Sequence, residues 1–346
     1  MAKGLQNKRA TSKDVAREAG VSQSTVSRVF NSSGISVSDA KKQRILETAE
    51  RLGYRPSQIA RSLNSQSTKI IGFVLSEFES EFYMRVLSFF TKKLQEAGYS
   101  VMIFNLNDDH EVEKNLKTAL EYQVAGLIIT SATLSSPLVE GCLRYKTPVF
   151  LFNRISDGLN VNTVCCDNID GGKTIANYLI DRGHKKLVYI SGDEKSSTNR
   201  DRKKGFVEQS NSRGLAEVTV LPGNYTYEAG FAAAETLIKD QIEFDGVFCA
   251  ADAMALGFID YIKYRTKLRI PEDISVVGFD GIPLHNEIHY QLTTFKQPME
   301  RMVDKTIEGL LGKIENFTTD AVHYLFFGQL IARGSVADRN EELRNS

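Results

Sequence analysis

One short segment carries polar side chains at a spacing that places them on a single face of a helix: Gln23, Ser24, Ser27 and Arg28. Amide, hydroxyl and guanidinium groups all form hydrogen bonds. On a helix lying in the major groove of duplex DNA, such groups reach the edges of base pairs. The chemistry that these residues offer is therefore the reading of a base sequence.

Two short helices and a sharp turn must position these side chains. Thr11 begins the first helix, and Asp14 completes a capping-box pattern three residues later. Gly20 supplies the backbone freedom that the turn needs. Ser22 then begins the second helix, whose apolar residues lie opposite the polar face. This order predicts a helix-turn-helix, and with it an all-α DNA-binding head.

Charge divides the chain into a basic head and an acidic body. Residues 1–70 hold 13 Lys and Arg against 5 Asp and Glu, a net charge of +8. The whole chain has 43 of each kind, so the remaining residues carry a net charge of −8. A basic block favours phosphate contacts, while an acidic remainder keeps the body off DNA.

Length and composition bound the rest of the chain. Its 346 residues are enough for two or three domains, and a 42% hydrophobic content is typical of soluble proteins. No apolar run approaches about 18 residues, and none follows the basic N-terminus, so neither a membrane span nor a secretion signal is expected. Four cysteines without CxxC spacing predict reduced thiols in the cytoplasm rather than disulfides or a zinc site.

A third helix and a hinge follow the head. The third helix begins after Ser38 and ends at Gly53. Pro56 breaks it, and Ser57 can cap a short helix that ends near the polar linker 64–67. Isolated helices of this length are marginal in water. We therefore expect this one to be ordered only when it packs against something.

From Lys69 onward, apolar runs alternate with amphipathic segments of helical length. This alternation predicts α/β architecture, with two doubly wound parallel-sheet lobes in series. Ligands in such folds sit at the carboxyl ends of the strands, here in the cleft between the lobes. The predicted strands are Ile70–Leu75, Val101–Asn105, Gly126–Thr130, Pro148–Phe152, Leu187–Ser191, Val218–Leu221, Val247–Ala250 and Ile274–Gly278. The predicted helices are Arg85–Ala97, Glu111–Gln123, Gly171–Arg182, Thr226–Lys239 and Ala253–Tyr264.

Two segments resemble catalytic motifs without completing them. Gly172-Lys-Thr174 matches the end of a phosphate-binding loop, but Asp167 stands where that loop needs its first glycine. His285-Asn-Glu-Ile-His289 lacks the glutamate directly after the first histidine that zinc proteases require. We therefore predict no catalytic residues, no metal, no cofactor and no enzyme activity.

The chain resembles the lac/gal repressor family of bacterial transcription regulators over nearly its full length. In the head and hinge the matching motifs are Asp14-Val-Ala, Thr25-Val-Ser-Arg-Val29, Leu52-Gly-Tyr-Arg-Pro56 and Ala60-Arg-Ser-Leu63. In the body they are Cys166-Asp-Asn168, Gly171-Gly172, Arg202 with Gly205, Ala251-Asp-Ala-Met-Ala-Leu-Gly257, Ile270-Pro-Glu-Asp-Ile-Ser-Val-Val-Gly-Phe-Asp280 and Leu292-Thr-Thr-Phe-Lys-Gln-Pro298.

The resemblance implies a homodimer whose two heads bind the halves of a palindromic DNA operator. Paired hinge helices would lie in the minor groove, where Leu63 of each subunit wedges between base steps and bends the duplex. Ala60 is small enough for the two hinge helices to approach closely. The residues expected to contact DNA are Thr11, Ser22, Gln23, Ser24, Thr25, Ser27, Arg28, Asn31, Tyr54, Ser57, Ala60, Arg61 and Leu63.

The resemblance also implies a domain plan. Residues 1–55 would form the head and 56–68 the hinge, followed by two effector lobes like those of periplasmic sugar-binding proteins. The first lobe would hold residues 69–165 and 298–323, and the second 166–297 and 324–346. A secreted binding protein, the competing reading of such lobes, does not fit the DNA-binding head.

A small-molecule effector, most simply a sugar or another polyhydroxylated molecule, would bind in the cleft. Phe82 and Tyr83 would offer flat rings to it. Arg202, expected just before a helix, and Asp252, just past a strand, would bind its hydroxyls. The full set of expected effector residues is Phe82, Tyr83, Asn153, Arg154, Asp167, Arg202, Asp252 and Asp280.

Three departures from the family pattern leave the effector open. Ser80-Glu-Phe-Tyr83 replaces the usual Asn-Pro-Phe-Phe, Ala251-Asp252 replaces Asn-Asp, and Asp280-Gly281 replaces Asp-Asp. A nucleoside or nucleobase is the second choice of ligand. Two other functions also remain: a global regulator of this family that answers to a protein partner, and a DNA-binding protein whose cleft is empty.

Overall fold

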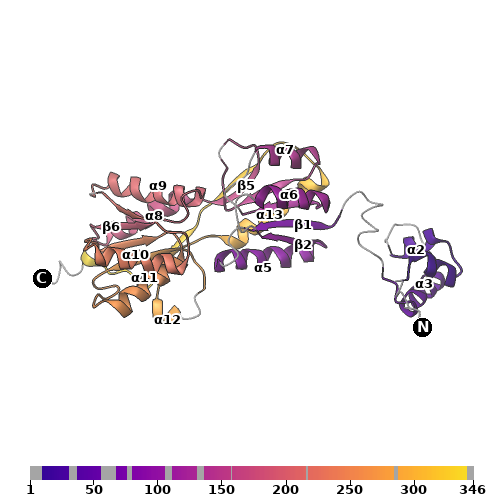
Figure 1. The fold of residues 1–346 in the computed structure, drawn as a ribbon, viewed down its shortest axis with the longest axis horizontal. Coiled ribbons are helices and arrows are strands. Elements are labelled where there is room, and N and C mark those ends of the chain that lie inside the picture. The colour runs from indigo at the N-terminus through magenta and orange to yellow at the C-terminus, as the bar shows by residue number, and fades with distance from the viewer. Residues whose placement is uncertain are drawn as a thin grey trace, which may run out of the picture. The chain divides into compact units, whose positions relative to one another are not determined.

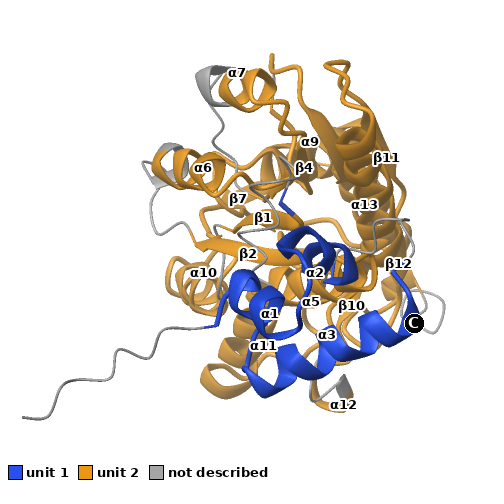
Figure 2. Cartoon of the chain, turned by 90° about the vertical axis from the view of Figure 1, so that its right-hand side faces the viewer, with its two compact units in different colours: residues 1–68 blue, residues 69–346 orange. Residues whose placement is uncertain are grey.

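The chain forms two compact units, residues 1–68 and residues 69–346, which Figure 2 colours separately. The computed structural model describes residues 10–30, 37–55, 68–75, 80–105, 111–130, 136–156, 158–215, 217–283 and 287–340. The predicted hinge residues 56–67 lie outside these ranges.

The head contains α1 (Ser12–Glu18), α2 (Gln23–Phe30) and α3 (Asp39–Arg51). Thr11 and Asp14 form the predicted capping box at the start of α1, and Gly20 makes the turn at a φ of 61°. The Ser22 hydroxyl caps α2 by accepting from the Thr25 amide at 3.2 Å. These local signals were readable in the sequence, and the predicted helix-turn-helix is confirmed.

A small apolar core holds the three helices together. Val15, Val26 and Ile45 are fully buried in it, one from each helix, and Phe30 and Tyr54 pack against it. The sequence predicts that Ser38 caps α3 and that Leu46 lies in its apolar stripe, and both details differ in the structure. Ser38 precedes the helix without capping it through its side chain, and Leu46 is 38% exposed.

The body is built on two six-stranded sheets. In the first, the strand order is β11-β5-β4-β3-β1-β2, and all neighbours are parallel. In the second, the order is β12-β10-β9-β8-β6-β7, with only the edge pair β10–β12 antiparallel. The first sheet comprises β1 (Ile70–Leu75), β2 (Ser100–Asn105), β3 (Gly126–Ile129), β4 (Val149–Phe152), β5 (Asn162–Cys166) and β11 (His323–Phe326). The second comprises β6 (Leu187–Ile190), β7 (Thr219–Leu221), β8 (Gly246–Cys249), β9 (Ser275–Asp280), β10 (Thr293–Lys296) and β12 (Gln329–Ile331).

Helices cover both faces of each sheet, which confirms the predicted two-lobed α/β class. Figure 1 shows α5, α6, α7 and α13 around the first sheet and α8 to α11 around the second. In the first lobe these are α5 (Glu81–Glu96), α6 (Glu111–Glu121), α7 (Ser136–Arg144) and α13 (Met299–Glu315). In the second lobe they are α8 (Asn168–Asp181), α9 (Ser197–Ser212), α10 (Tyr227–Lys239), α11 (Asp252–Arg265) and α12 (Glu287–Tyr290).

The chain passes between the lobes after β5, after β10 and after β11. The third passage corrects the predicted plan, which moved the chain to the second lobe after residue 323. The whole of β11, His323–Phe326, pairs with β5 in the first sheet, so the passage follows Phe326. Parallel pairing with a strand 160 residues earlier in the chain explains why the local sequence did not reveal it.

Two glycines bring α8 and α9 into backbone contact. A Cβ atom at Gly172 would lie 2.3 Å from the Arg202 carbonyl oxygen, and one at Gly205 would lie 2.1 Å from the Ile169 carbonyl oxygen. Neither position leaves room for a side chain. This contact fixes α9, and with it Arg202, against the start of α8.

Gly205→Ala should lower the free energy of unfolding by about 1–3 kcal/mol, because the added methyl group must force the two backbones apart. Gly312→Ala on α13 is the matched control, since a Cβ atom there meets nothing within 4 Å. That change should stabilise the helix by about 0.5–1 kcal/mol. Urea unfolding of both variants tests the pair, and equal effects would contradict the close approach.

All four cysteines are buried and unpaired, as predicted. Burial raises the pKa of the Cys142 thiol to about 11 and that of Cys165 to about 12. Thiols in this environment stay protonated and unreactive. Within the described part of the chain, no cluster of His, Cys, Asp and Glu could hold a metal ion, and no helix is long and apolar enough to span a membrane.

Candidate functional sites

The polar face of α2 is the candidate site on the head. Gln23, Ser24 and Arg28 are exposed, and Ser27 is half-buried. Gln23 donates to the Ser12 hydroxyl at 3.0 Å, and the Ser22 hydroxyl lies 2.8 Å from those of Ser24 and Thr25. These contacts hold the shorter side chains in place while the Arg28 guanidinium stays free of the head's core.

The other residues expected to contact DNA either lie outside the polar face of α2 or fall outside the described residues. Thr11 is exposed as the cap of α1, whereas Tyr54 packs edge-on against Phe30 at 5.7 Å between ring centroids. The Tyr54 ring therefore has a packing role in the head. Five predicted contacts lie outside the described residues: Asn31, Ser57, Ala60, Arg61 and Leu63.

Arg28→Ala should weaken specific DNA binding by about 1–3 kcal/mol and relax the preference at one base pair, because a guanidinium reads a base edge with two hydrogen bonds. Lys3→Ala, in the basic N-terminal segment, should weaken all sequences alike and only slightly. Selection of binding sites from random DNA measures both effects. An unchanged consensus at full affinity for Arg28→Ala would remove Arg28 from the reading face.

The body contains a cleft that is lined by both lobes. The first lobe contributes residues that precede or begin α5 and follow β4. The second contributes the start of α9, the loop after β7 and residues that follow β8 and β9. The lining residues are Ser80, Glu81, Phe82, Tyr83, Asn153, Arg154, Thr198, Arg202, Tyr225, Ala251, Ala253, Asp280 and Ile282.

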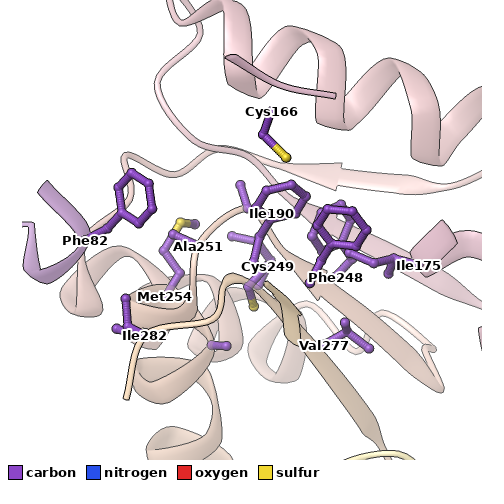
Figure 3. Packing of buried hydrophobic residues seen from close by; sticks show 14 of the residues in the cluster. Phe82, Cys166, Ile175, Ile190, Phe248, Cys249, Ala251, Met254, Val277 and Ile282 are labelled. Atoms are coloured by element: carbon purple, nitrogen blue, oxygen red, sulfur yellow. The ribbon is translucent and has the colours of Figure 1, made fainter. Parts of the chain in front are cut away.

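Two aromatic rings form the wall of the first lobe. Phe82 and Tyr83 are each 3% exposed and meet edge to face, with 5.2 Å between their ring centroids. The Ser80 hydroxyl caps α5 just before them, which explains why this helix begins earlier than predicted. Figure 3 shows Phe82 beside Ala251 and Ile282 of the second lobe, so apolar surface from both lobes faces the cleft.

Arg154 connects the first lobe to the second across this cleft. Its guanidinium lies 5.4 Å from the Tyr83 ring centroid and donates to the Thr198 hydroxyl of α9 at 3.2 Å. The next backbone amide, of Ile155, donates to the Ser197 hydroxyl at 2.9 Å. Tyr225 continues the network, since its hydroxyl lies 3.1 Å from that of Thr198. The lobes are thus joined by polar contacts at the start of α9.

Arg202 is buried in the wall of the second lobe, with 2% of its surface exposed. It donates to the Asn168 side chain at 2.9 Å and to the Ala250 carbonyl at 2.5 Å, and it stacks 3.7 Å from the Phe279 ring centroid. Its remaining nitrogen lies 3.6 Å from the Asp280 carboxylate. Arg202 was expected before a helix, but it lies within α9, whose weakly amphipathic sequence gave little periodicity to detect.

Two predicted effector residues do not line the cleft. Asp167 caps α8 by accepting from the Asp170 amide at 2.9 Å. Asp252 is 1% exposed, and its carboxyl group binds the backbone amides of Gly281 and Ile282 and the Thr294 hydroxyl. Burial, aided by the nearby Asp280 carboxylate, raises the pKa of Asp252 to about 8 against these hydrogen bonds. The expectation that Asp252 faces a ligand is corrected by this geometry.

Three of the seven non-glycine residues with positive φ in the described part of the chain line the cleft. Asn153, Tyr225 and Asp280 have positive φ values of 54°, 69° and 122°, and all three line it. Such conformations cost energy in residues other than glycine and gather at functional sites. Thr198 and Tyr225, together with Ser80, Glu81, Ala251, Ala253 and Ile282, line the cleft without having been predicted as site residues. The polar start of α9 and the loop after β7 carry no motif that could have marked them.

Two family profiles match the chain in the order of its two units. Residues 11–57 match the profile described as bacterial regulatory proteins, lacI family. Residues 68–321 match that described as periplasmic binding proteins and sugar binding domain of LacI family. The chain therefore belongs to the lacI family of bacterial regulatory proteins, as its motifs indicated. It is a transcriptional repressor with a ligand-binding body, and the prediction that it is not an enzyme is confirmed.

Individual relatives agree with this membership. The chain is 32% identical over 290 residues to catabolite control protein A of Priestia megaterium, covering 83% of this chain and 87% of that protein. It is 31% identical over 333 residues to the ribose operon repressor of Escherichia coli strain K12, covering 94% and 99% of the two chains.

Solved structures show the same fold. A CelR–cellobiose complex has a TM-score of 0.70 and 27% identity, with 94% of this chain and 100% of that one covered. The lac repressor dimer bound to operator has a TM-score of 0.85, with 95% and 100% covered, and at 24% identity it supports the fold alone.

Proposed function

We propose that the protein represses transcription as a homodimer that binds a palindromic operator, and that a small polyhydroxylated molecule in the cleft controls this binding. The observation that carries the ligand proposal is the composition of the cleft wall. It combines two flat rings with buried guanidinium groups, a carboxylate and hydroxyls. Rings pack on the apolar face of a sugar, while the charged groups form strong hydrogen bonds with its hydroxyls.

The named ligands of relatives point the same way. One relative is a ribose operon repressor, and one similar structure is a cellobiose complex. Both lobes contribute polar side chains to the cleft, as a ligand with hydroxyls on several sides requires. Asn153, Arg154, Arg202 and Asp280 are then the polar contacts, with Phe82 and Tyr83 as the stacking surface.

Control follows from the position of the cleft between two lobes. A ligand that contacts both lobes binds one lobe arrangement more tightly than the other, and its binding free energy shifts the population toward that arrangement. We propose that the hinge passes this shift to the heads. A ligand that separates the hinges is an inducer, and one that brings them together is a corepressor.

A thermal-shift screen tests the ligand proposal. D-ribose, D-glucose, cellobiose and hypoxanthine are added in turn at millimolar concentration to the full-length protein. A ligand present at about 100 times its Kd stabilises the folded state by about 2.7 kcal/mol, which is readily measured. A shift with a sugar supports the proposal, and a shift with hypoxanthine alone replaces it with a nucleobase. No shift with any of them favours an empty cleft or control by a protein partner.

Leu63→Ala should weaken operator binding and reduce the bend in the DNA while leaving ligand affinity unchanged. The reason is that an apolar wedge unstacks a base step and kinks the duplex, whereas alanine is too short to do so. Circularly permuted operator fragments report the bend directly. Equal bends with the two proteins would contradict the wedge.

A further inference from the structure

One buried carboxyl group ties together three segments at the edge of the second sheet that faces the cleft. Asp252 begins α11 directly after β8. One of its oxygens accepts from the amides of Gly281 and Ile282 at 2.8 and 3.0 Å, beyond the end of β9. Its other oxygen lies 2.5 Å from the Thr294 hydroxyl of β10. The residue therefore contacts all three segments while 1% exposed.

The segment that Asp252 holds has an unfavourable backbone. Asp280 has a φ of 122° and Gly281 a φ of 70°, the first of which is costly for any residue with a Cβ atom. A strained turn persists only where its surroundings determine it. The two amide hydrogen bonds to Asp252 supply that constraint. Gly278 leaves room for the Asp252 side chain, because a Cβ atom there would lie 2.2 Å from the carboxyl oxygen that faces Thr294.

The strained turn decides where the Asp280 side chain lies. In this conformation its carboxylate accepts from the side-chain amide of Gln297 at 2.7 Å and lies 3.6 Å from the Arg202 guanidinium. Asp280 and Ile282 both line the cleft, whereas Asp252 does not. Asp280 and Ile282 thus belong to a turn that Asp252 holds by hydrogen bonds from outside the cleft.

We propose that Asp252 is a positioning residue for effector recognition: its buried carboxyl group holds the Asp280–Ile282 turn so that Asp280 faces Arg202 in the cleft. The inference rests on the proposed function only in taking the cleft as the effector site. One oxygen of Asp252 accepts from both backbone amides, and the other accepts from the Thr294 hydroxyl.

Asparagine keeps the acceptor for the two backbone amides, and alanine removes it. In Asp252→Asn the side-chain oxygen accepts from Gly281 and Ile282, and the Thr294 hydroxyl turns to accept from the side-chain nitrogen. In Asp252→Ala both backbone amides lose their acceptor. Asp260→Asn is the control on the same helix, because Asp260 accepts from Tyr227 and Tyr290 away from the cleft.

Hydrogen–deuterium exchange of the unliganded protein at pH 7 measures the two backbone hydrogen bonds. Asp252→Ala should speed exchange at Gly281 and Ile282 by about tenfold or more, the effect of losing one buried hydrogen bond. Asp252→Asn and Asp260→Asn should leave these amides as protected as in the wild type. Protection that persists in Asp252→Ala, or is lost equally in Asp252→Asn, would overturn the proposal.

A second readout lies across the cleft wall. The 15N-labelled Nε signal of Arg202, assigned by its loss in Arg202→Lys, should shift in Asp252→Ala because Asp280 has moved, and should stay in place in Asp252→Asn. If Asp252→Ala does not fold, Thr294→Val and Thr294→Ser replace it, with the serine variant restoring what valine loses. An Arg202 signal that stays in place in both Asp252→Ala and Thr294→Val would contradict a positioning role for Asp252. None of these measurements needs the ligand. They therefore test the positioning role of Asp252 even if no sugar binds in the screen.

Discussion

Replacing Arg202 by alanine should abolish ligand binding in the cleft and also lower the free energy of unfolding by about 3–5 kcal/mol, because it removes one partner of a buried ion pair and the donor of two buried hydrogen bonds. The loss is large because this guanidinium has several partners. The Asn168 side chain and the Ala250 carbonyl each lose a hydrogen-bond donor, and the Asp280 carboxylate loses a positive charge 3.6 Å away.

Two measurements separate these effects. Urea unfolding gives the stability loss, and calorimetry with the sugar found in the screen gives ligand binding at a temperature where the variant is folded. Arg200→Ala is a matched control, since that neighbouring arginine is half-exposed and its ion pair is with the adjacent Asp201. It should change stability by about 0–1 kcal/mol. Full ligand affinity in Arg202→Ala would exclude Arg202 from the site.

Between pH 5 and 8 the wild-type protein should become less stable as the pH rises, whereas Asp252→Asn should lack this slope. The pKa of Asp252 is raised to about 8 in the folded protein. In the unfolded chain an aspartate loses its proton near pH 4. In the interval between, the folded state binds a proton that the unfolded state lacks, so stability falls by up to about 1.4 kcal/mol per pH unit.

The comparison of the two proteins isolates this group from others that titrate nearby in pH. Buried His184 has a lowered pKa, which gives the opposite slope, but it contributes equally to both proteins. The ionisable groups that face Asp252 are Asp280 on β9 and Cys249 on β8. Urea midpoints at half-unit intervals of pH measure the difference. Parallel curves for the two proteins would show that Asp252 ionises normally.

Much of the fold could be predicted because its signals are local. The capping box at Thr11, the turn at Gly20 and the apolar runs of the strands each depend on a few neighbouring residues. The aromatic pair at the start of α5 and the buried arginines were likewise identified from motifs. These features need no knowledge of distant contacts.

The rest depends on contacts between residues far apart in the chain. Asp252 follows a strand in a way that suggests a side chain facing the cleft, but its partners lie 29, 30 and 42 residues later. Tyr225 has a left-handed backbone, and its hydroxyl contacts that of Thr198, which lies 27 residues earlier in the chain. The edge strand β11 is defined by its pairing with β5 rather than by its own residues.

The contacts of Arg154 and Ile155 with the start of α9 have a kinetic consequence. Asn153, Arg154 and Arg202 are each at most 3% exposed, so the ligand that we propose would reach them only after the lobes part and these two hydrogen bonds break. Association and dissociation of the ligand then share one step, the opening of the lobes, whose rate does not depend on the ligand. At high ligand concentration the rate of association should level off at the rate of that step. The residence time of the effector on the repressor is then set by how often the two lobes separate.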